Sequence, residues 1–155
     1  MKTDRFTQIY LHFILVVEER EWMTSEEEEH ELYQFIHQMV NRLGHRSLAI
    51  NGIPGHLHLL MEFNPEQSPD ETIREIKLAS SGFVNARRWL NAPFRWEPGY
   101  GAFTYSGSQI GKALEYIRNQ QQYHEREQEL LNSLSKPDIG GTMINGRILF
   151  DFTDV

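Results

Sequence analysis

The sequence contains no cysteine, which excludes disulfide scaffolds and thiolate-ligated zinc or iron–sulfur sites. It also lacks an apolar run long enough for a membrane helix, and its first five residues show no apolar core of a signal peptide. These absences predict a soluble cytoplasmic protein that does not enter a membrane. With 155 residues, 39% of them hydrophobic and 24% charged, the chain has the length and composition of one folded domain.

Positive charge is scarce, because 15 lysines and arginines stand against 22 acidic residues and give a net charge of −7. Such an excess argues against a nucleic-acid partner when it is spread evenly. It is concentrated, however, in residues 18–31, which contain eight glutamates and one cation. Residues 74–95 carry five cations against one glutamate, interleaved with aromatic residues. Net charge therefore does not decide the partner: this second segment fits a solvated helix face or a surface for single-stranded nucleic acid.

Apolar and capping patterns predict an α+β domain. The run at residues 8–17 is β-branched and aromatic, typical of a central strand, and serine-headed capping boxes begin two helices at Ser25 and Ser68. The predicted strands cover residues 8–17, 47–53, 56–63 and 102–105, and the predicted helices cover residues 25–43, 68–90 and 108–131. This order is the ferredoxin-like (split βαβ) arrangement: an antiparallel sheet with helices on one face, plus a C-terminal helix.

The tail differs from the rest of the chain in its pattern. We expect the domain to cover residues 1–135 and the tail to cover residues 136–155. Asn145-Gly146 lies between apolar residues in this tail, and that dipeptide is the strongest short-range signal for a β-hairpin. The sequence therefore predicts a hairpin at the C-terminal end.

Two histidines stand in the third predicted strand, as His56-Leu57-His58. Residues two apart in a strand point to the same side, with Cα atoms about 7 Å apart, so both imidazoles can reach one metal ion. Two histidines hydrogen-bonded at a sheet edge would give the same pattern. The motif alone therefore leaves a metal site and a purely structural role open.

Tyr116 and Gln120 are one turn apart in the last predicted helix, so they share a helical face. A glutamine carbonyl oxygen is a hard ligand, which suits magnesium or manganese beside imidazoles. A tyrosine next to such a cation predicts nucleophilic attack on a phosphodiester whose oxygens the metal polarises. A packing tyrosine and a solvated glutamine have the same spacing, so the spacing alone favours no chemistry.

Taken together, three blocks of the sequence resemble the single-tyrosine HUH transposases of bacterial insertion sequences, whose relatives include REP-associated tyrosine transposases. The blocks are residues 52–60 with the His-hydrophobic-His motif, residues 96–103 and residues 116–120, with further matches at residues 10–13 and Lys77. The resemblance extends from about residue 6 to about residue 130. The chain departs from the family at Gly55, where an aspartate is usual, and at residues 17–20, where a Thr-Lys pair is frequent.

The resemblance implies a site and a mechanism. His56, His58 and Gln120 would hold a divalent metal, Mg²⁺ or Mn²⁺, and Tyr116 would attack single-stranded DNA. Attack leaves a 5′-phosphotyrosine link and a free 3′-hydroxyl, and a hydroxyl later reverses the link. Family members are homodimers that recognise imperfect hairpins, and the tyrosine helix can complete the site of the other subunit. On charge alone, phosphate contacts are predicted for Arg74, Lys77, Arg87 and Arg88.

The sequence thus predicts a metal-dependent DNA strand transferase that mobilises an insertion sequence. Two alternatives stay open: a domesticated relative that acts on host palindromic repeats, and a non-catalytic ferredoxin-like module that binds single-stranded nucleic acid or a protein. A binding module has no need of Tyr116 beside Gln120, which argues against the second alternative. A plain metal-dependent hydrolase would differ from all of these in forming no covalent protein–DNA adduct.

Overall fold

The computed structural model describes residues 5–18, 22–23, 25–53, 55–119, 141–144 and 147–150. Seven elements form the main body in the order expected from the sequence. They are β1 (Tyr10–Val16), α1 (Glu26–Arg42), β2 (Arg46–Ile53), β3 (His56–Glu62), α2 (Pro69–Arg87), β4 (Gly101–Tyr105) and α3 (Ile110–Arg118). None of the helices in these residues has the length and apolar character of a membrane span.

The four strands of the body form one antiparallel sheet in the order β2-β3-β1-β4. The strand β1 is central, as its largely apolar, β-branched and aromatic run predicts, and it pairs with β3 on one side and β4 on the other. This order is that of the ferredoxin-like fold, so the predicted fold class is confirmed. In the register of β1 with β3, Ile14 lies opposite His58 and Val16 opposite His56.

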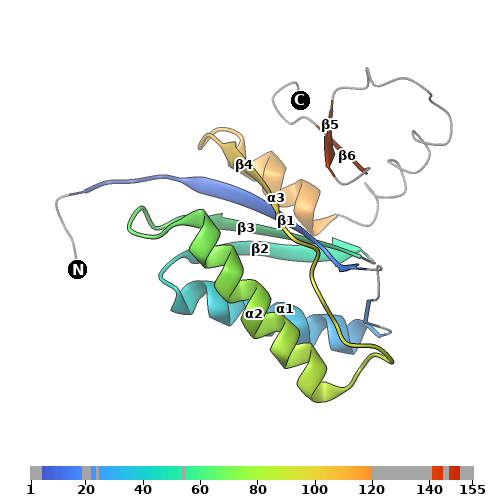
Figure 1. The fold of residues 1–155 in the computed structure, drawn as a ribbon. Coiled ribbons are helices and arrows are strands. Elements are labelled where there is room, and N and C mark those ends of the chain that lie inside the picture. The colour runs from blue at the N-terminus through green and yellow to red at the C-terminus, as the bar shows by residue number, and fades with distance from the viewer. Residues whose placement is uncertain are drawn as a thin grey trace, which may run out of the picture.

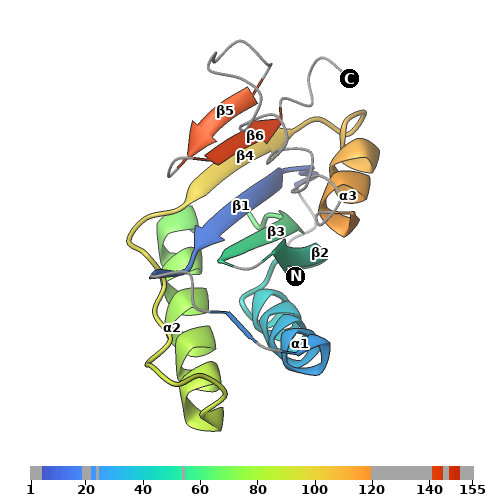
Figure 2. The same ribbon diagram turned by 90° about the vertical axis from the view of Figure 1, so that its right-hand side faces the viewer.

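The two faces of the sheet are covered differently (Figures 1 and 2). Helices α1 and α2 lie side by side on one face, and α3 lies on the other. Beneath α1 and α2 is the main core, to which β1 and β3 contribute alternate apolar residues. Those residues are Leu11, Phe13, Leu15, Leu57, Leu59 and Met61. The cluster under α3 is much smaller and consists of buried Leu60, Ala113, Tyr116 and Ile117.

Helices α1 and α2 begin where the serines predict. The hydroxyl of Ser25 accepts a hydrogen bond from the amide of Glu28, and Ser68 does the same for Glu71, both at 3.1 Å. The predicted end of α2 at residue 90 is wrong. The helix ends at Arg87 because Arg88 adopts a left-handed backbone with φ of 55°, which stops the helical hydrogen-bond ladder.

The last helix is shorter than predicted, and the tail is described only in part. Helix α3 begins at Ile110, two residues later than predicted, and it ends at Arg118 with Asn119 as its C-cap, so the predicted continuous helix to residue 131 is wrong. The rest of the predicted helix, residues 120–131, lies outside the described residues, as does the predicted boundary at residue 135. In the tail, β5 (Gly141–Ile144) and β6 (Arg147–Phe150) pair antiparallel as a separate two-stranded sheet.

Candidate active site

The two histidines of the His-hydrophobic-His motif lie at the start of β3, on the face of the sheet that α3 covers. Their side chains are 2% exposed for His56 and 0% for His58, and their ring centroids are 6.1 Å apart. Leu57 lies between them in sequence but points into the main core on the other face. The strand period therefore puts both imidazoles on one face of the sheet.

Two glycines shape the β2–β3 turn that leads into His56. A Cβ atom at Gly52 would lie 2.5 Å from the carbonyl oxygen of His56, closer than real carbon–oxygen contacts, so only glycine fits there. Gly55 has a φ of 89°, a left-handed backbone that glycine adopts without steric cost. This conformation gives a reason for the glycine at position 55 where the resembling family usually has aspartate.

Tyr116 reaches the same face from α3. Its ring stands edge-on against the ring of His58, with centroids 6.0 Å apart and an interplanar angle of 71°. The side chain is only 1% exposed, since it packs within the small cluster beneath α3. The structure therefore brings Tyr116 and His58 together, whereas Gln120 lies outside the described residues.

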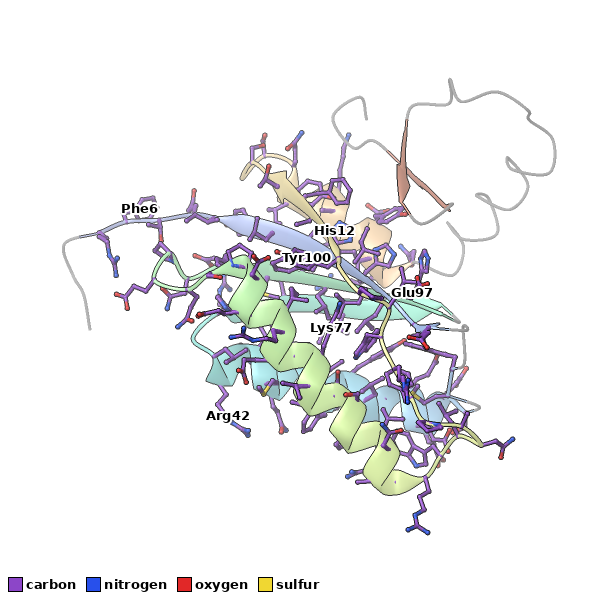
Figure 3. The ribbon with its side chains drawn as sticks, viewed as in Figure 1. Phe6, His12, Arg42, Lys77, Glu97 and Tyr100 are labelled. Atoms are coloured by element: carbon purple, nitrogen blue, oxygen red, sulfur yellow. The ribbon has the colours of Figure 1, made fainter. Side chains whose placement is uncertain are left out.

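A residue that the sequence did not single out as part of the site, His12, lies beside His58. His12 sits on β1 toward α3 (Figure 3), and its Nε2 is 2.7 Å from Nδ1 of His58. Its own Nδ1 is 2.8 Å from the hydroxyl of Tyr105 on β4. Two signals in the sequence point to His12: it is a histidine inside an otherwise apolar central strand, and it lies in the family match at residues 10–13. Nothing in the sequence marks Tyr105.

Burial keeps these imidazoles neutral. It lowers the pKa of His12 to about 3. It lowers the pKa of His58 well below its ordinary value, and the neighbouring rings of His12 and His56 add to that effect. A neutral imidazole has one nitrogen with a free lone pair, and that is the form in which histidine binds a metal ion.

The residues present fit a divalent metal. Nε2 of His58 is buried, and it has no hydrogen-bond partner within the described part of the chain. Its other nitrogen, Nδ1, is held by His12, and metal-bound histidines usually have a partner at the second nitrogen. No three His, Cys, Asp or Glu residues among those described could hold a metal ion. A metal here therefore needs a further ligand, and the family resemblance implies that this ligand is Gln120.

The comparison with protein families decides what kind of protein carries this site. The model of the family described as "Transposase IS200 like" matches residues 5–120, about three quarters of the chain. The chain belongs to the IS200-like transposase family. The resemblance inferred from its three sequence blocks is thereby confirmed. A comparison with curated proteins finds no match.

Solved structures of transposases share the fold. A candidate transposase from Deinococcus radiodurans R1 has a TM-score of 0.59 and 22% identity, over 77% of this chain and 98% of that one. A REP-associated tyrosine transposase bound to a REP hairpin has a TM-score of 0.58 and 15% identity, over 95% of this chain and 97% of that one. At these identities the likeness supports the ferredoxin-like fold alone.

In this transposase, the four cations predicted to contact phosphate belong to α2 and its C-terminal cap, on the face of the sheet opposite His58 and Tyr116. Lys77 is engaged: its ammonium donates to the carbonyl oxygens of Glu97 at 2.9 Å and Gly99 at 2.6 Å. Figure 3 shows Lys77 beside Glu97, and burial lowers the pKa of Lys77. The structure therefore does not bring Lys77 to the histidines, and its visible role is to hold the segment before β4.

The three arginines of this group are all exposed. The guanidinium of Arg87 lies over the ring of Phe83, 3.6 Å from its centroid, whereas Arg74 and Arg88 project from the outer surface of α2 and its end. If they bind phosphates, those phosphates belong to DNA that extends beyond the site at His58.

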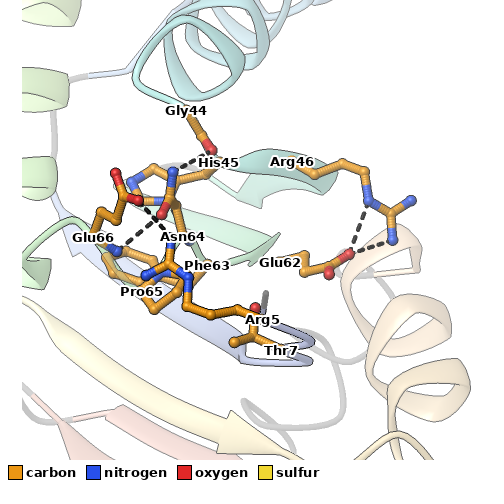
Figure 4. Close-up of a pocket in the computed structure, with 10 residues that line it drawn as sticks. All are labelled: Arg5, Thr7, Gly44, His45, Arg46, Glu62, Phe63, Asn64, Pro65 and Glu66. Atoms are coloured by element: carbon orange, nitrogen blue, oxygen red, sulfur yellow. Dashed lines mark hydrogen bonds and ion pairs between the residues drawn. The ribbon is translucent and has the colours of Figure 1, made fainter. Parts of the chain in front are cut away.

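A pocket of about 690 Å³ lies at the opposite end of β3 from His56 (Figure 4). Its lining includes Glu62 and Phe63, six and seven residues along the chain, so it is about 20 Å from the start of the strand. The charged groups of this pocket pair with each other: Arg46 with Glu62 at 2.6 Å, and Arg5 with Glu66 at 2.5 Å. The pocket is therefore distinct from the site of the transposase family's histidine motif.

Proposed function

We propose that this transposase cleaves and rejoins single-stranded DNA through a covalent link to Tyr116, with a divalent metal held by His56, His58 and Gln120. The single observation that carries the proposal is the edge contact between Tyr116 and His58. It puts a phenol next to a buried imidazole whose Nε2 has no partner among the described residues. A module that only binds nucleic acid has no use for that arrangement.

The proposed ligand set favours a particular class of metal ion. Two neutral imidazoles and an amide oxygen suit Mn²⁺ or Mg²⁺, which accept hard and borderline ligands in open coordination. When bound, such an ion polarises the oxygens of a phosphodiester and stabilises the charge that develops on them. His58 contributes through Nε2, since its Nδ1 is committed to His12.

Tyr116 supplies the nucleophile. Its phenol oxygen forms a bond to phosphorus while the bond from phosphorus to the 3′ oxygen breaks, which leaves a 5′-phosphotyrosine and a 3′-hydroxyl. The phenol proton leaves during attack and a proton is delivered to the 3′ oxygen, so the step is balanced without a cofactor that stores energy. Attack of a 3′-hydroxyl on the phosphotyrosine then reseals DNA and releases Tyr116.

The burial of Tyr116 sets a condition on this chemistry. A side chain that is 1% exposed cannot meet a DNA backbone, so the chain around α3 must move before cleavage. Helix α3 packs through a small cluster, which makes such a movement less costly than displacing α1 or α2 would be. We propose that the movement accompanies the assembly of a homodimer on DNA.

The DNA that this transposase acts on is proposed to contain a hairpin. A solved structure with the same fold is bound to a REP hairpin, and it matches 95% of this chain. The same observation supports the second candidate function: a domesticated relative that acts on palindromic repeats of the host. The chemistry at Tyr116 is the same in both cases, so the target sequence distinguishes them.

The test is the trapping of a covalent adduct. The protein is incubated with labelled single-stranded hairpin pools and Mn²⁺, and the products are separated on a denaturing gel. We expect a slowly migrating adduct for the wild type and for Tyr10→Phe, a matched loss of a hydroxyl from the edge of the same face. We expect none for Tyr116→Phe. Cleavage that persists in Tyr116→Phe without an adduct would show a metallonuclease instead.

A further inference from the structure

A hydrogen-bonded series of three side chains crosses the sheet beneath α3. Tyr105 on β4, His12 on β1 and His58 on β3 come from three adjacent strands, and the two contacts between them are 2.8 Å and 2.7 Å long. His12 is 2% exposed and His58 is 0% exposed, so the link between the two rings is shielded from water. At one end of this series is Nε2 of His58, the atom proposed to bind the metal.

Each neutral imidazole carries one proton, so the donors and acceptors in this series can be arranged in only two directions. In the first, Tyr105 donates to His12, His12 donates to Nδ1 of His58, and the proton of His58 lies on Nε2. In the second, Nδ1 of His58 donates to His12, His12 donates to the oxygen of Tyr105, and Nε2 of His58 keeps its lone pair. Only the second direction lets His58 bind a metal ion.

We propose that His12 and Tyr105 are positioning residues that hold His58 in the form with its proton on Nδ1 and its Nε2 lone pair free for metal. The inference rests on the proposed role of His58 as a metal ligand. Neither residue touches the metal or DNA in this proposal, and both act through the orientation and proton position of His58.

Burial and geometry support the second direction. In the first, the N–H at Nε2 of His58 would be a buried donor that the described residues do not satisfy, and because His58 is 0% exposed, bulk water cannot supply the missing acceptor. In the second, the unpaired atom is an acceptor lone pair, which a metal ion can fill. The ring of Tyr105 also stacks on His12, with centroids 5.9 Å apart, so it restrains the orientation of His12 as well.

Another buried histidine shows how such a proton position is fixed. Nδ1 of His45 accepts from the backbone amide of Asn64 at 2.9 Å, so its proton must lie on Nε2, which donates to the hydroxyl of Thr72. A backbone amide can only donate, so it fixes the position of the proton on His45. His58 has a side chain in that place, so its proton position depends on His12 and can be changed by substitution.

The first measurement is the proton position itself, read from long-range ¹H–¹⁵N spectra of the metal-free protein. We expect the wild type to show His58 protonated on Nδ1. We expect Tyr105→Phe, which removes the acceptor for His12, to shift part of the population to the other form, while Tyr10→Phe, at the strand position opposite Tyr105, leaves it unchanged. A wild type with the proton of His58 on Nε2 would overturn the proposal.

The second measurement is the affinity for Mn²⁺, by calorimetry. Loss of a hydrogen-bond partner of a metal-bound histidine typically weakens binding by about 10- to 100-fold, and we expect this loss for His12→Leu. His12→Gln keeps an acceptor for His58 and a donor for Tyr105, so it should bind within a few-fold of the wild type. His45→Gln is the control for changing a buried histidine. Equal affinities for His12→Leu and the wild type would overturn the proposal.

The same titrations separate this inference from the proposed function. If His58→Ala abolishes Mn²⁺ binding but His12→Leu does not weaken it, the metal site stands and the positioning role fails. If the wild type binds no Mn²⁺, the metal site fails, and the positioning of a metal ligand fails with it. Thermal unfolding of each metal-free variant shows whether a loss of binding reflects a loss of fold.

Discussion

The two faces of the sheet have different tasks. The face under α1 and α2 is covered by a large apolar cluster that includes buried residues of β1, β3, α1 and α2. The face under α3 has a cluster of four buried residues and, beside it, the three buried histidines His12, His56 and His58. Stability thus comes mainly from one face, and the groups suited to chemistry gather on the other.

A single strand serves both faces. Along β3, His56, His58 and Leu60 alternate with Leu57, Leu59 and Met61, which point into the main core. Because side chains alternate along a strand, the packing of one set fixes the position of the other to within the rigidity of the backbone. A transposase can thereby hold its histidines firmly although few apolar contacts surround them.

The largest effect that would break this comparison is on stability. We expect Leu59→Ala to lower the free energy of unfolding by about 2–5 kcal/mol, because it opens a cavity in the main core. We expect His58→Gln, at the preceding residue, to change this free energy by no more than about 1 kcal/mol, since the lost ring includes a buried nitrogen that no described residue satisfies. Urea unfolding of the metal-free proteins measures both.

The two substitutions should have the opposite ranking in their effect on metal binding. We expect His58→Gln to lose Mn²⁺ binding and Leu59→Ala to retain it at temperatures where the variant is folded. A loss of stability in His58→Gln as large as that in Leu59→Ala would show that the histidine face is part of the stabilising core, and the separation of tasks would then be wrong.

The sequence predicted the main core and the order of its elements because apolar periodicity and serine caps are local signals. The strand period also indicated that His56 and His58 share a face, and the resemblance to the transposase family implied that Tyr116 joins them. The sequence could not indicate Tyr105, because a contact between diagonal positions on β1 and β4 depends on the register of strands about 90 residues apart. The predicted α2 was too long for a different reason: arginine rarely adopts a left-handed backbone, so the residue type at position 88 does not reveal that the helix ends there.

A smaller effect concerns pH and the buried histidine of the main face. Burial lowers the pKa of His45 in the folded protein below 6.5, its value in the unfolded chain. Below pH 6.5 the unfolded chain therefore binds a proton that the folded protein does not, and stability falls as the pH falls. The loss from His45 is at most about 1.4 kcal/mol for each pH unit.

Replacement of His45 isolates this contribution. We expect the urea midpoint of the metal-free wild type to fall more between pH 7 and pH 5 than that of His45→Gln. The histidines of the other face are present in both proteins, so their effects cancel in the difference. Equal changes in the two proteins would mean that His45 is protonated as readily when folded, in conflict with its acceptance of the Asn64 amide.

The smallest effect concerns the cations of α2 and its C-terminal cap, which lie on the face away from the histidines. If Arg74 and Arg88 contact phosphates, each substitution by alanine should lower the slope of log affinity against log salt by about 0.7 for single-stranded DNA. The rate of cleavage of bound DNA should stay unchanged, because neither side chain is on the face of Tyr116. Fluorescence anisotropy over a range of salt concentrations measures the slope.

Lys77 is the matched control, since it belongs to the same helix but its ammonium already binds two carbonyl oxygens. We expect Lys77→Met to leave the salt slope unchanged and to lower the free energy of unfolding by about 1–2 kcal/mol, through the lost charged hydrogen bonds. A reduced slope in Lys77→Met with unchanged stability would mean that Lys77 leaves these carbonyls to bind DNA. The face under α1 and α2 would then take part in DNA binding as well as in holding the fold.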